Sequence, residues 1–137
     1  MDDAKVQIRE YSGPGYQPVV TYATWRVAIM HNADEIEPER LQQVERHLET
    51  DEVFVLLGGK CVLIIGMGEG TSVGELVALP MEPQKVYNVR RGVWHTTIMS
   101  GDASVLIIEN ADTAAVNSEF APLSAQQRRW IRPISAY

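Results

Sequence analysis

The stretch VFVLLGGKCVLII, residues 53–65, decides the fold, because it places two short apolar runs on either side of a Gly-Gly pair. Each run is rich in Val, Ile and Leu and is bounded by turn residues, which is typical of strands rather than helices. Gly58 and Gly59 supply the backbone freedom that a tight turn between two antiparallel strands needs. The stretch therefore predicts a β-hairpin in the core of the protein.

The same pattern continues along the chain, where Gly and Pro recur between short runs rich in Val, Ile, Tyr and Thr. Strands are predicted over roughly 4–10, 19–30, 52–57, 60–66, 75–79, 84–90, 93–99 and 103–109. A short helix is predicted over roughly 38–44, with Pro38 in its first turn. A second is predicted after Ser124, because Ser124 and Gln127 have capping-box spacing.

This density of strands, with helices only at the margins, predicts an all-β fold. We expect a single domain over residues 1–137, built as an antiparallel β-barrel or jelly roll with one or two short flanking helices. The mouth of such a barrel is a common place for a ligand, so a small-molecule site is expected there.

Composition and charge narrow the class of function. The 137 residues are 45% apolar and 22% charged, as in a globular domain that buries its own core. The net charge of −6 argues against binding to nucleic acid or to an anionic membrane, since both require a basic surface. The apolar run Cys61 to Ile65 is too short to cross a bilayer, and the acidic N-terminus is not expected to act as a signal peptide. One cysteine excludes an intrachain disulfide, so a cytoplasmic location is expected.

Two polar clusters interrupt the apolar pattern and carry the candidate site residues. The first contains Glu45, His47 and Glu52, just before the predicted hairpin, and the second is RGVWH, residues 91–95. Residues two apart in a strand share a face, so Glu45 and His47 are expected to point the same way. Together with His95 they offer two imidazoles and two carboxylates, which suit Zn, Mn, Fe or Ni as a divalent metal. The same groups equally suit acid–base catalysis without a metal, with His95, His47 and Glu52 as catalytic residues, and no organic cofactor is expected.

Other side chains in or near the second cluster have expected roles as well. Arg91 is a candidate for binding a substrate carboxylate, because guanidinium pairs with carboxylate through two hydrogen bonds. Tyr87 is a candidate for lining the pocket by strand alternation. Gly92 allows the backbone to bend so that His95 re-enters the barrel, while Trp94 faces away into apolar packing.

The segment ERHLETDEVFVLLGGK, residues 45–60, resembles the first motif of the cupin superfamily. In that motif HxH is followed by three or four residues, a Glu, six residues and a Gly. His47, Glu52 and Gly59 match the motif in order, and Glu45 stands in place of its first histidine.

The second cupin motif, PxGxxH followed by three residues and Asn, is resembled by the second cluster. Gly92 and His95 match it, whereas Arg90 stands in place of the proline and Met99 in place of the asparagine. The resemblance covers roughly residues 45–99. It implies a cupin (RmlC-like) barrel, a fold that hosts many unrelated functions.

Within the superfamily the chain resembles the ureidoglycolate lyases. The resemblance rests on Glu45-Arg46-His47 with Phe54 downstream, and on the RGVWH pentad. Members of that family release urea from a small hydroxy acid and leave glyoxylate, and they are often homodimers. The resemblance therefore implies a lyase with a small-molecule substrate and a homodimeric assembly. The acidic segment 48–52 and Thr96-Thr97 depart from the lyase pattern, and the alternative is a non-catalytic metabolite-binding cupin.

Overall fold

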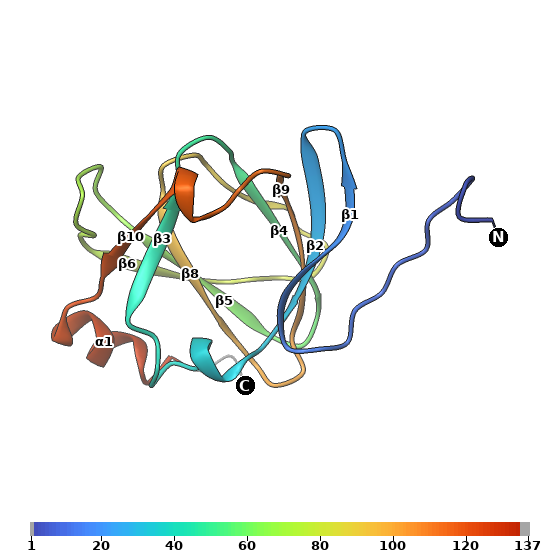
Figure 1. The fold of residues 1–137 in the computed structure, drawn as a ribbon. Helices are drawn as coiled ribbons and strands as arrows, with labels where there is room; N and C mark the ends of the chain where they lie inside the picture. The colour runs from blue at the N-terminus through green and yellow to red at the C-terminus, as the bar shows by residue number, and fades with distance from the viewer. Residues whose placement is uncertain (1, 135–137) are drawn as a thin grey trace.

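Two five-stranded antiparallel sheets face each other in the computed structural model, which describes residues 2–134 (Figure 1). The first sheet has the strand order β1 (Gly15–Tyr22), β2 (Trp25–His31), β9 (Ser104–Asn110), β4 (Glu52–Gly58) and β7 (Tyr87–Val89). The second has the order β10 (Ser118–Pro122), β3 (Gln43–His47), β8 (Trp94–Met99), β5 (Cys61–Gly66) and β6 (Leu76–Pro80). The pairings are antiparallel, so the predicted all-β barrel or jelly roll is confirmed.

Short helices lie at the margins of the sheets. They are two 3-10 helices, Asp34–Ile36 and Ala115–Asn117, and the helix α1, Ala125–Ile131. Helix α1 begins where the sequence predicts: Ser124 Oγ accepts a hydrogen bond from the Gln127 backbone N–H at 3.0 Å, and Gln127 Oε1 accepts one from the Ser124 N–H at 2.8 Å. Over residues 2–134, no helix combines the length and the apolar character that crossing a membrane requires.

Side chains that alternate along each strand fill the space between the two sheets. Phe54 of β4 and both Val105 and Ile107 of β9 are buried in this core. Because residues two apart share a face, Glu52 and Glu109 continue these apolar rows toward one end of the barrel. Each of the two acidic residues is 6% exposed. The alternation that builds the core thus also places two carboxylates inside the barrel.

Strand β5 is buried on both faces and separates two apolar cores. Cys61 and Leu63 pack in the core between the sheets, whereas Val62 and Ile64 pack in a second core with Ile131 of α1. A continuous apolar run suits a strand that is covered on both sides. Figure 1 shows α1 beside the second sheet, on the side away from β1.

The predicted hairpin over residues 53–65 is wrong in its pairing. β4 pairs with β7 and β9 in the first sheet, and β5 pairs with β6 and β8 in the second. Both strands present an apolar face to the same interior. An apolar pattern of this kind is expected whether two strands pair side by side or face each other across the core. The Gly-Gly turn carries the chain between the sheets: Gly59 has φ +66°, and a Cβ there would lie 2.6 Å from Ala103 Cα.

Other element predictions also change. Residues 4–10 form no strand, and Val6 and Ile8 are exposed. The run 19–30 bends at Ala23, which has φ +49°, and so becomes the antiparallel pair β1 and β2. The segment 38–44 forms a turn that leads into β3 rather than a helix. Leu41 lies in its irregular part and packs in the second core. Strand β10 was not predicted.

Candidate active site in the barrel

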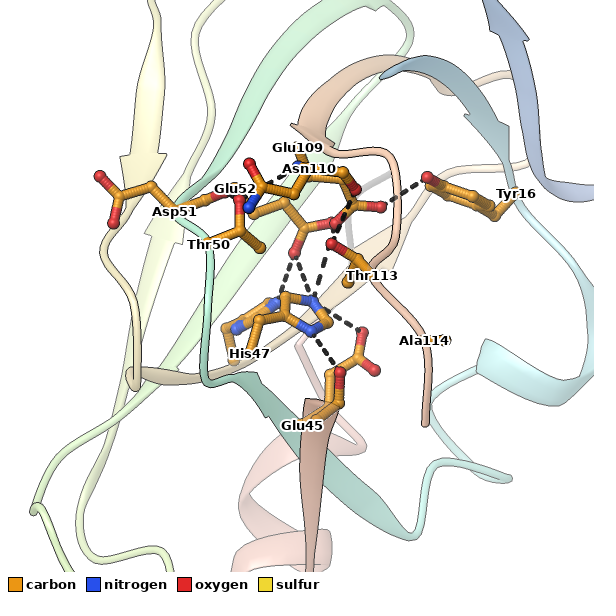
Figure 2. Close-up of polar contacts among 12 residues, drawn as sticks. Tyr16, Glu45, His47, Thr50, Asp51, Glu52, Glu109, Asn110, Thr113 and Ala114 are labelled. Atoms are coloured by element: carbon orange, nitrogen blue, oxygen red, sulfur yellow. Dashed lines mark hydrogen bonds and ion pairs between the residues drawn. The ribbon is translucent and has the colours of Figure 1, made fainter. Parts of the chain in front are cut away.

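A cavity of about 320 Å³ lies in the barrel and receives side chains from both sheets. Glu45 and His47 reach it from β3, Glu52 from β4 and His95 from β8. Strands β3 and β8 are paired so that Glu45 lies opposite His95. Figure 2 shows His47 between Glu45 on one side and the carboxylates of Glu52 and Glu109 on the other. The structure therefore brings both polar clusters of the sequence into one site.

The carboxylate of Glu52 lies at the centre of the site. Its Oε1 atom is 3.0 Å from His47 Nε2 and 2.8 Å from His95 Nε2. The centres of the two imidazole rings are 5.3 Å apart. All three residues are buried, with exposures of 7% for His47, 6% for Glu52 and 3% for His95. The two imidazoles thus converge on a single oxygen away from bulk water.

The far nitrogen of each imidazole is held by the protein. His95 Nδ1 lies 2.9 Å from the Val93 carbonyl oxygen, which only accepts, so this nitrogen carries the proton. His47 Nδ1 lies 2.8 Å from Ser118 Oγ, which can donate or accept. The Nε2 atom of a neutral His95 therefore offers a lone pair toward Glu52.

The pKa values follow from these contacts. Burial alone would raise the pKa of Glu52, but the hydrogen bonds from His47 and His95 outweigh burial and lower that pKa to about 2. Burial acts to lower the pKa of each imidazole, yet the hydrogen bond to Glu52 and its negative charge outweigh burial and raise both pKa values. Glu52 and the two imidazoles therefore stabilise each other's charged forms.

The RGVWH segment bends as the sequence predicts. Gly92 has φ +81°, a conformation that favours glycine, and its N–H donates to the His47 carbonyl oxygen at 2.8 Å. Trp94 is 1% exposed in the second core, and the guanidinium carbon of Arg46 lies 4.2 Å from its ring centre. His95, the next residue, points to the opposite face and lines the cavity.

Arg91 and Tyr87 do not line this cavity. Arg91 is exposed, and its backbone N–H donates to Asp51 Oδ1 at 2.7 Å on the outer surface. The Tyr87 hydroxyl accepts a hydrogen bond from the Glu82 N–H at 2.9 Å. The structure therefore places both predicted substrate-binding side chains away from the imidazoles.

Tyr16, Arg26 and Glu109 line the cavity and were missed by the sequence analysis. The Tyr16 hydroxyl donates to Glu109 Oε1 at 2.5 Å, and Arg26 donates to the same oxygen at 3.0 Å. Glu109 lies in the predicted strand 103–109 on the same face as Val105 and Ile107. That parity is the signal that could have identified it, because a carboxylate that ends an apolar row must face the interior.

Arg26 also fixes one wall of the cavity. Its guanidinium donates to the carbonyl oxygens of Ala111 at 3.0 Å and Thr113 at 2.9 Å, and its Nε donates to the Tyr16 hydroxyl at 2.8 Å. Thr113 and Ala114 line the cavity. Arg26 thereby holds the segment that follows β9 against the barrel.

The second oxygen of Glu109 has no hydrogen-bond partner among the described residues. This Oε2 atom lies 3.9 Å from His47 Nε2, and the Glu109 side chain is 3% exposed. Burial, the negative charge of Glu52 and close contact between the two carboxyl groups raise the pKa of Glu109, against the opposing hydrogen bonds from Tyr16 and Arg26.

Two overlapping groups of side chains have the composition of metal ligands. Glu45, His47 and His95 form one group, and His47, Glu52 and Glu109 form the other. Within each group the ligand atoms lie within 4.8 Å of one another.

A second hollow adjoins the cavity. Ile36, Glu45, His95, Thr96 and Phe120 line both spaces. The cavity therefore continues outward past Glu45 and Phe120.

No family model matches the chain, and no curated protein matches its sequence. Its fold is similar to that of the nucleoside dehydratase Pac13 from Streptomyces, solved with uridine, at 10% identity over 85% of each chain with a TM-score of 0.56. CapF, a capsular polysaccharide assembling protein from Staphylococcus aureus, is 15% identical over 85% of this chain and 32% of its own, with a TM-score of 0.56. The 3,4-ketoisomerase QdtA from Thermoanaerobacterium thermosaccharolyticum, in complex with TDP, is 14% identical over 68% of this chain and 63% of its own, with a TM-score of 0.53. At these identities the similarity establishes the cupin-like barrel fold.

Proposed function

We propose that the cavity is the active site of a metal-dependent enzyme that acts on a small hydroxylated metabolite. The contact between His95 and Glu52 carries the proposal. Val93 fixes the Nδ1 proton of His95, so a neutral ring directs the lone pair of Nε2 at a carboxylate oxygen 2.8 Å away. Two such electron-rich atoms repel each other unless a proton or a cation lies between them.

Glu45, His47 and His95 form one group of ligand atoms that suits a divalent cation, and His47 with Glu52 belongs to a second, overlapping group. Atoms bound to one ion at about 2.1 Å lie no more than about 4.2 Å apart. His47 Nε2 is 3.0 Å from Glu52 Oε1 and 4.0 Å from Glu45 Oε1, within that limit. Both imidazoles have their far nitrogen held by the protein, which is usual for metal-binding histidines. Imidazoles and carboxylates suit Zn, Mn, Fe or Ni.

The charge of the cavity supports the same proposal. Glu45, Glu52 and Glu109 face it, whereas Arg26 is its only arginine or lysine within the described part of the chain. A substrate carboxylate would be repelled by this excess of negative charge, and Arg91 lies too far out to hold it. A bound cation would supply the positive charge that a substrate carboxylate needs, and it would polarise a substrate oxygen.

The specific reaction that we propose is the release of urea from ureidoglycolate, which follows the sequence resemblance to ureidoglycolate lyases. Glu45 accepts the proton of the substrate hydroxyl, because its side chain is 43% exposed and makes no hydrogen bond with the described residues. The carbon–nitrogen bond breaks, its electron pair stays on the leaving nitrogen, and the hydroxyl oxygen becomes the carbonyl of glyoxylate. Glu45 then gives the proton to the leaving nitrogen, so protons and charge balance.

Metal analysis and a glyoxylate assay test this proposal. The chain is purified without chelator and without a metal-affinity tag, and its metal content is measured by mass spectrometry. Glyoxylate release is then assayed in the protein as purified, after chelation, and after metal is returned. We expect a bound divalent metal, metal-dependent turnover, and loss of turnover in Glu45→Gln. A protein that retains no metal and releases no glyoxylate would contradict the proposal.

Non-catalytic binding of a nucleoside-type metabolite is the second candidate function. The solved structures of Pac13 with uridine and QdtA with TDP favour it, since both ligands carry a planar base. In this chain Phe120 lines the cavity and is 47% exposed, so its ring can stack on such a base. Calorimetric titration with uridine tests this candidate. Tight binding without any turnover would favour it over the lyase.

We also propose that the protein is a homodimer. Residues 2–14 extend away from the barrel (Figure 1), and Val6 and Ile8 in this segment are 49% and 73% exposed. An extended segment with exposed apolar side chains suits contact with a second copy of the chain. Light scattering at micromolar concentration tests this assembly, and a monomeric mass would contradict it.

A further inference from the structure

Glu109 is a buried carboxylate with only one of its two oxygens satisfied. Oε1 accepts hydrogen bonds from Tyr16 at 2.5 Å and from Arg26 at 3.0 Å, whereas Oε2 has no partner among the described residues. The side chain is 3% exposed. A buried polar oxygen without a partner is costly, so such an atom in a folded protein calls for a ligand.

Arg26 orients Glu109 without satisfying that oxygen. The three guanidinium nitrogens of Arg26 already donate to Glu109 Oε1, to the Tyr16 hydroxyl and to two backbone carbonyl oxygens. With Oε1 fixed in this way, Oε2 is presented to the site, 3.9 Å from His47 Nε2 (Figure 2). The arrangement resembles that of a metal-binding carboxylate, which is usually held by hydrogen bonds on its other oxygen.

His47 lies within metal-ligand distance of three carboxylates: Glu109 falls with Glu52 and His47 in one group of ligand atoms, and Glu45 falls with His47 and His95 in another. The His47 Nε2 atom is 3.0 Å from Glu52, 3.9 Å from Glu109 and 4.0 Å from Glu45. Each separation is below the limit of about 4.2 Å for two atoms bound to one cation. Glu109 is therefore as well placed as Glu45, although it comes from β9, a strand outside both sequence motifs.

We infer that Glu109 is an additional ligand of the divalent cation, an inference that rests on the metal site proposed above. Glu109 adds a second carboxylate to the group that His47 and Glu52 form. Carboxylate-rich, six-coordinate sites suit Mn²⁺. Glu109 is therefore expected to raise the affinity for Mn²⁺ relative to Zn²⁺, compared with a site made of the four motif residues alone.

Calorimetric titration of metal-free protein with Mn²⁺ and, separately, with Zn²⁺ tests this inference. Glu109→Gln is the main variant, because its amide oxygen can still accept the hydrogen bonds of Tyr16 and Arg26 while the ligand oxygen is lost. Glu119→Gln is the matched control: it removes the same charge from a side chain that is 42% exposed and paired with Arg46 outside the cavity. Circular dichroism checks that each variant is folded.

We expect Glu109→Gln to weaken Mn²⁺ binding by about tenfold or more and to weaken Zn²⁺ binding less, so that the Mn²⁺ to Zn²⁺ affinity ratio falls. Glu119→Gln should leave both affinities unchanged. Unchanged Mn²⁺ binding in Glu109→Gln, or an equal loss for both ions, would overturn the inference, since an equal loss reflects charge alone. A native protein that binds neither ion would instead overturn the metal site itself.

A crystal structure of the native protein with Mn²⁺ gives a second measurement if Glu109→Gln does not fold. Glu109 Oε2 bound to the ion would support the inference. An ion bound without Glu109 would overturn it and leave the motif residues as the site.

Discussion

Glu52 and His95 join the two sheets across the interior of the barrel. They are 43 positions apart in the chain, on β4 of the first sheet and β8 of the second, and Glu52 Oε1 lies 2.8 Å from His95 Nε2. Both side chains are buried. Because a buried charged group that loses its partner destabilises the fold, the candidate site and the stability of the barrel depend on each other.

Replacing His95 with Ala should therefore impair metal binding and folding together. The substitution removes one proposed ligand and leaves Glu52 with His47 alone, so the free energy of unfolding should fall by about 3 kcal/mol. Denaturant unfolding in chelator and calorimetric titration with metal measure the two effects. His31→Ala is the matched control, because His31 is hydrogen-bonded to the Gly13 carbonyl oxygen away from the cavity. Native metal affinity in His95→Ala would count against the site.

The metal-free protein should be most stable at mildly acidic pH. The pKa of Glu52 is lowered from 4.5 to about 2, so its contribution is complete above pH 4.5 and is lost as the pH falls toward 2. The pKa values of His47 and His95 are raised above 6.5, so their contribution is complete below pH 6.5 and is lost as the pH rises through the raised values.

Thermal unfolding in chelator from acid to neutral pH measures this dependence. We expect the highest melting temperature between the usual pKa values of a glutamate, 4.5, and a histidine, 6.5. Glu52→Gln should flatten the acid side of the profile. A native melting temperature that rises steadily from pH 5 to pH 8 would contradict the coupling of Glu52 to the imidazoles.

Gly92→Ala should destabilise the bend that precedes His95. Gly92 has φ +81° and a Cβ there would meet no atom within 4 Å, so the cost comes from backbone strain alone, about 1 kcal/mol. Gly101→Ala is the matched control, because its Cβ also meets no atom and its φ is not in the strained region. Chemical denaturation compares the two, and equal stabilities would show that the bend tolerates a side chain.

Arg91→Ala should leave stability and metal affinity unchanged, whereas Arg26→Met should destabilise the fold. Arg91 is exposed and outside the cavity, so its loss should change neither metal affinity nor stability. Arg26→Met leaves the buried Glu109 without its guanidinium partner, so the free energy of unfolding should fall by about 3 kcal/mol. Denaturant unfolding and metal titration of both variants test this contrast. Loss of glyoxylate release in Arg91→Ala, with metal binding retained, would restore the substrate-binding role expected from the sequence.

The sequence predicts individual strands and one motif site better than it predicts partners in space. Alternation along β4 and β9 shows which side chains face inward, and the spacing of His47, Glu52 and His95 indicates a shared site. Alternation carries no information on whether two strands pair or face each other, which is why β4 and β5 were assigned to one hairpin. Glu109 was missed for a related reason: its partners Tyr16 and Arg26 are distant in the chain and belong to no motif.

The hydrogen bonds of Arg26 to the carbonyl oxygens of Ala111 and Thr113 hold one side of the cavity in place. The segment that contains Thr113 and Ala114 is held by Arg26, and displacing it would break these partly buried hydrogen bonds. The opposite side, past Glu45 and Phe120, is continuous with the neighbouring hollow. If the cavity binds a metabolite as we propose, this side is the expected entrance, and the Phe120 ring and the Glu45 carboxylate would be the first groups that the metabolite meets.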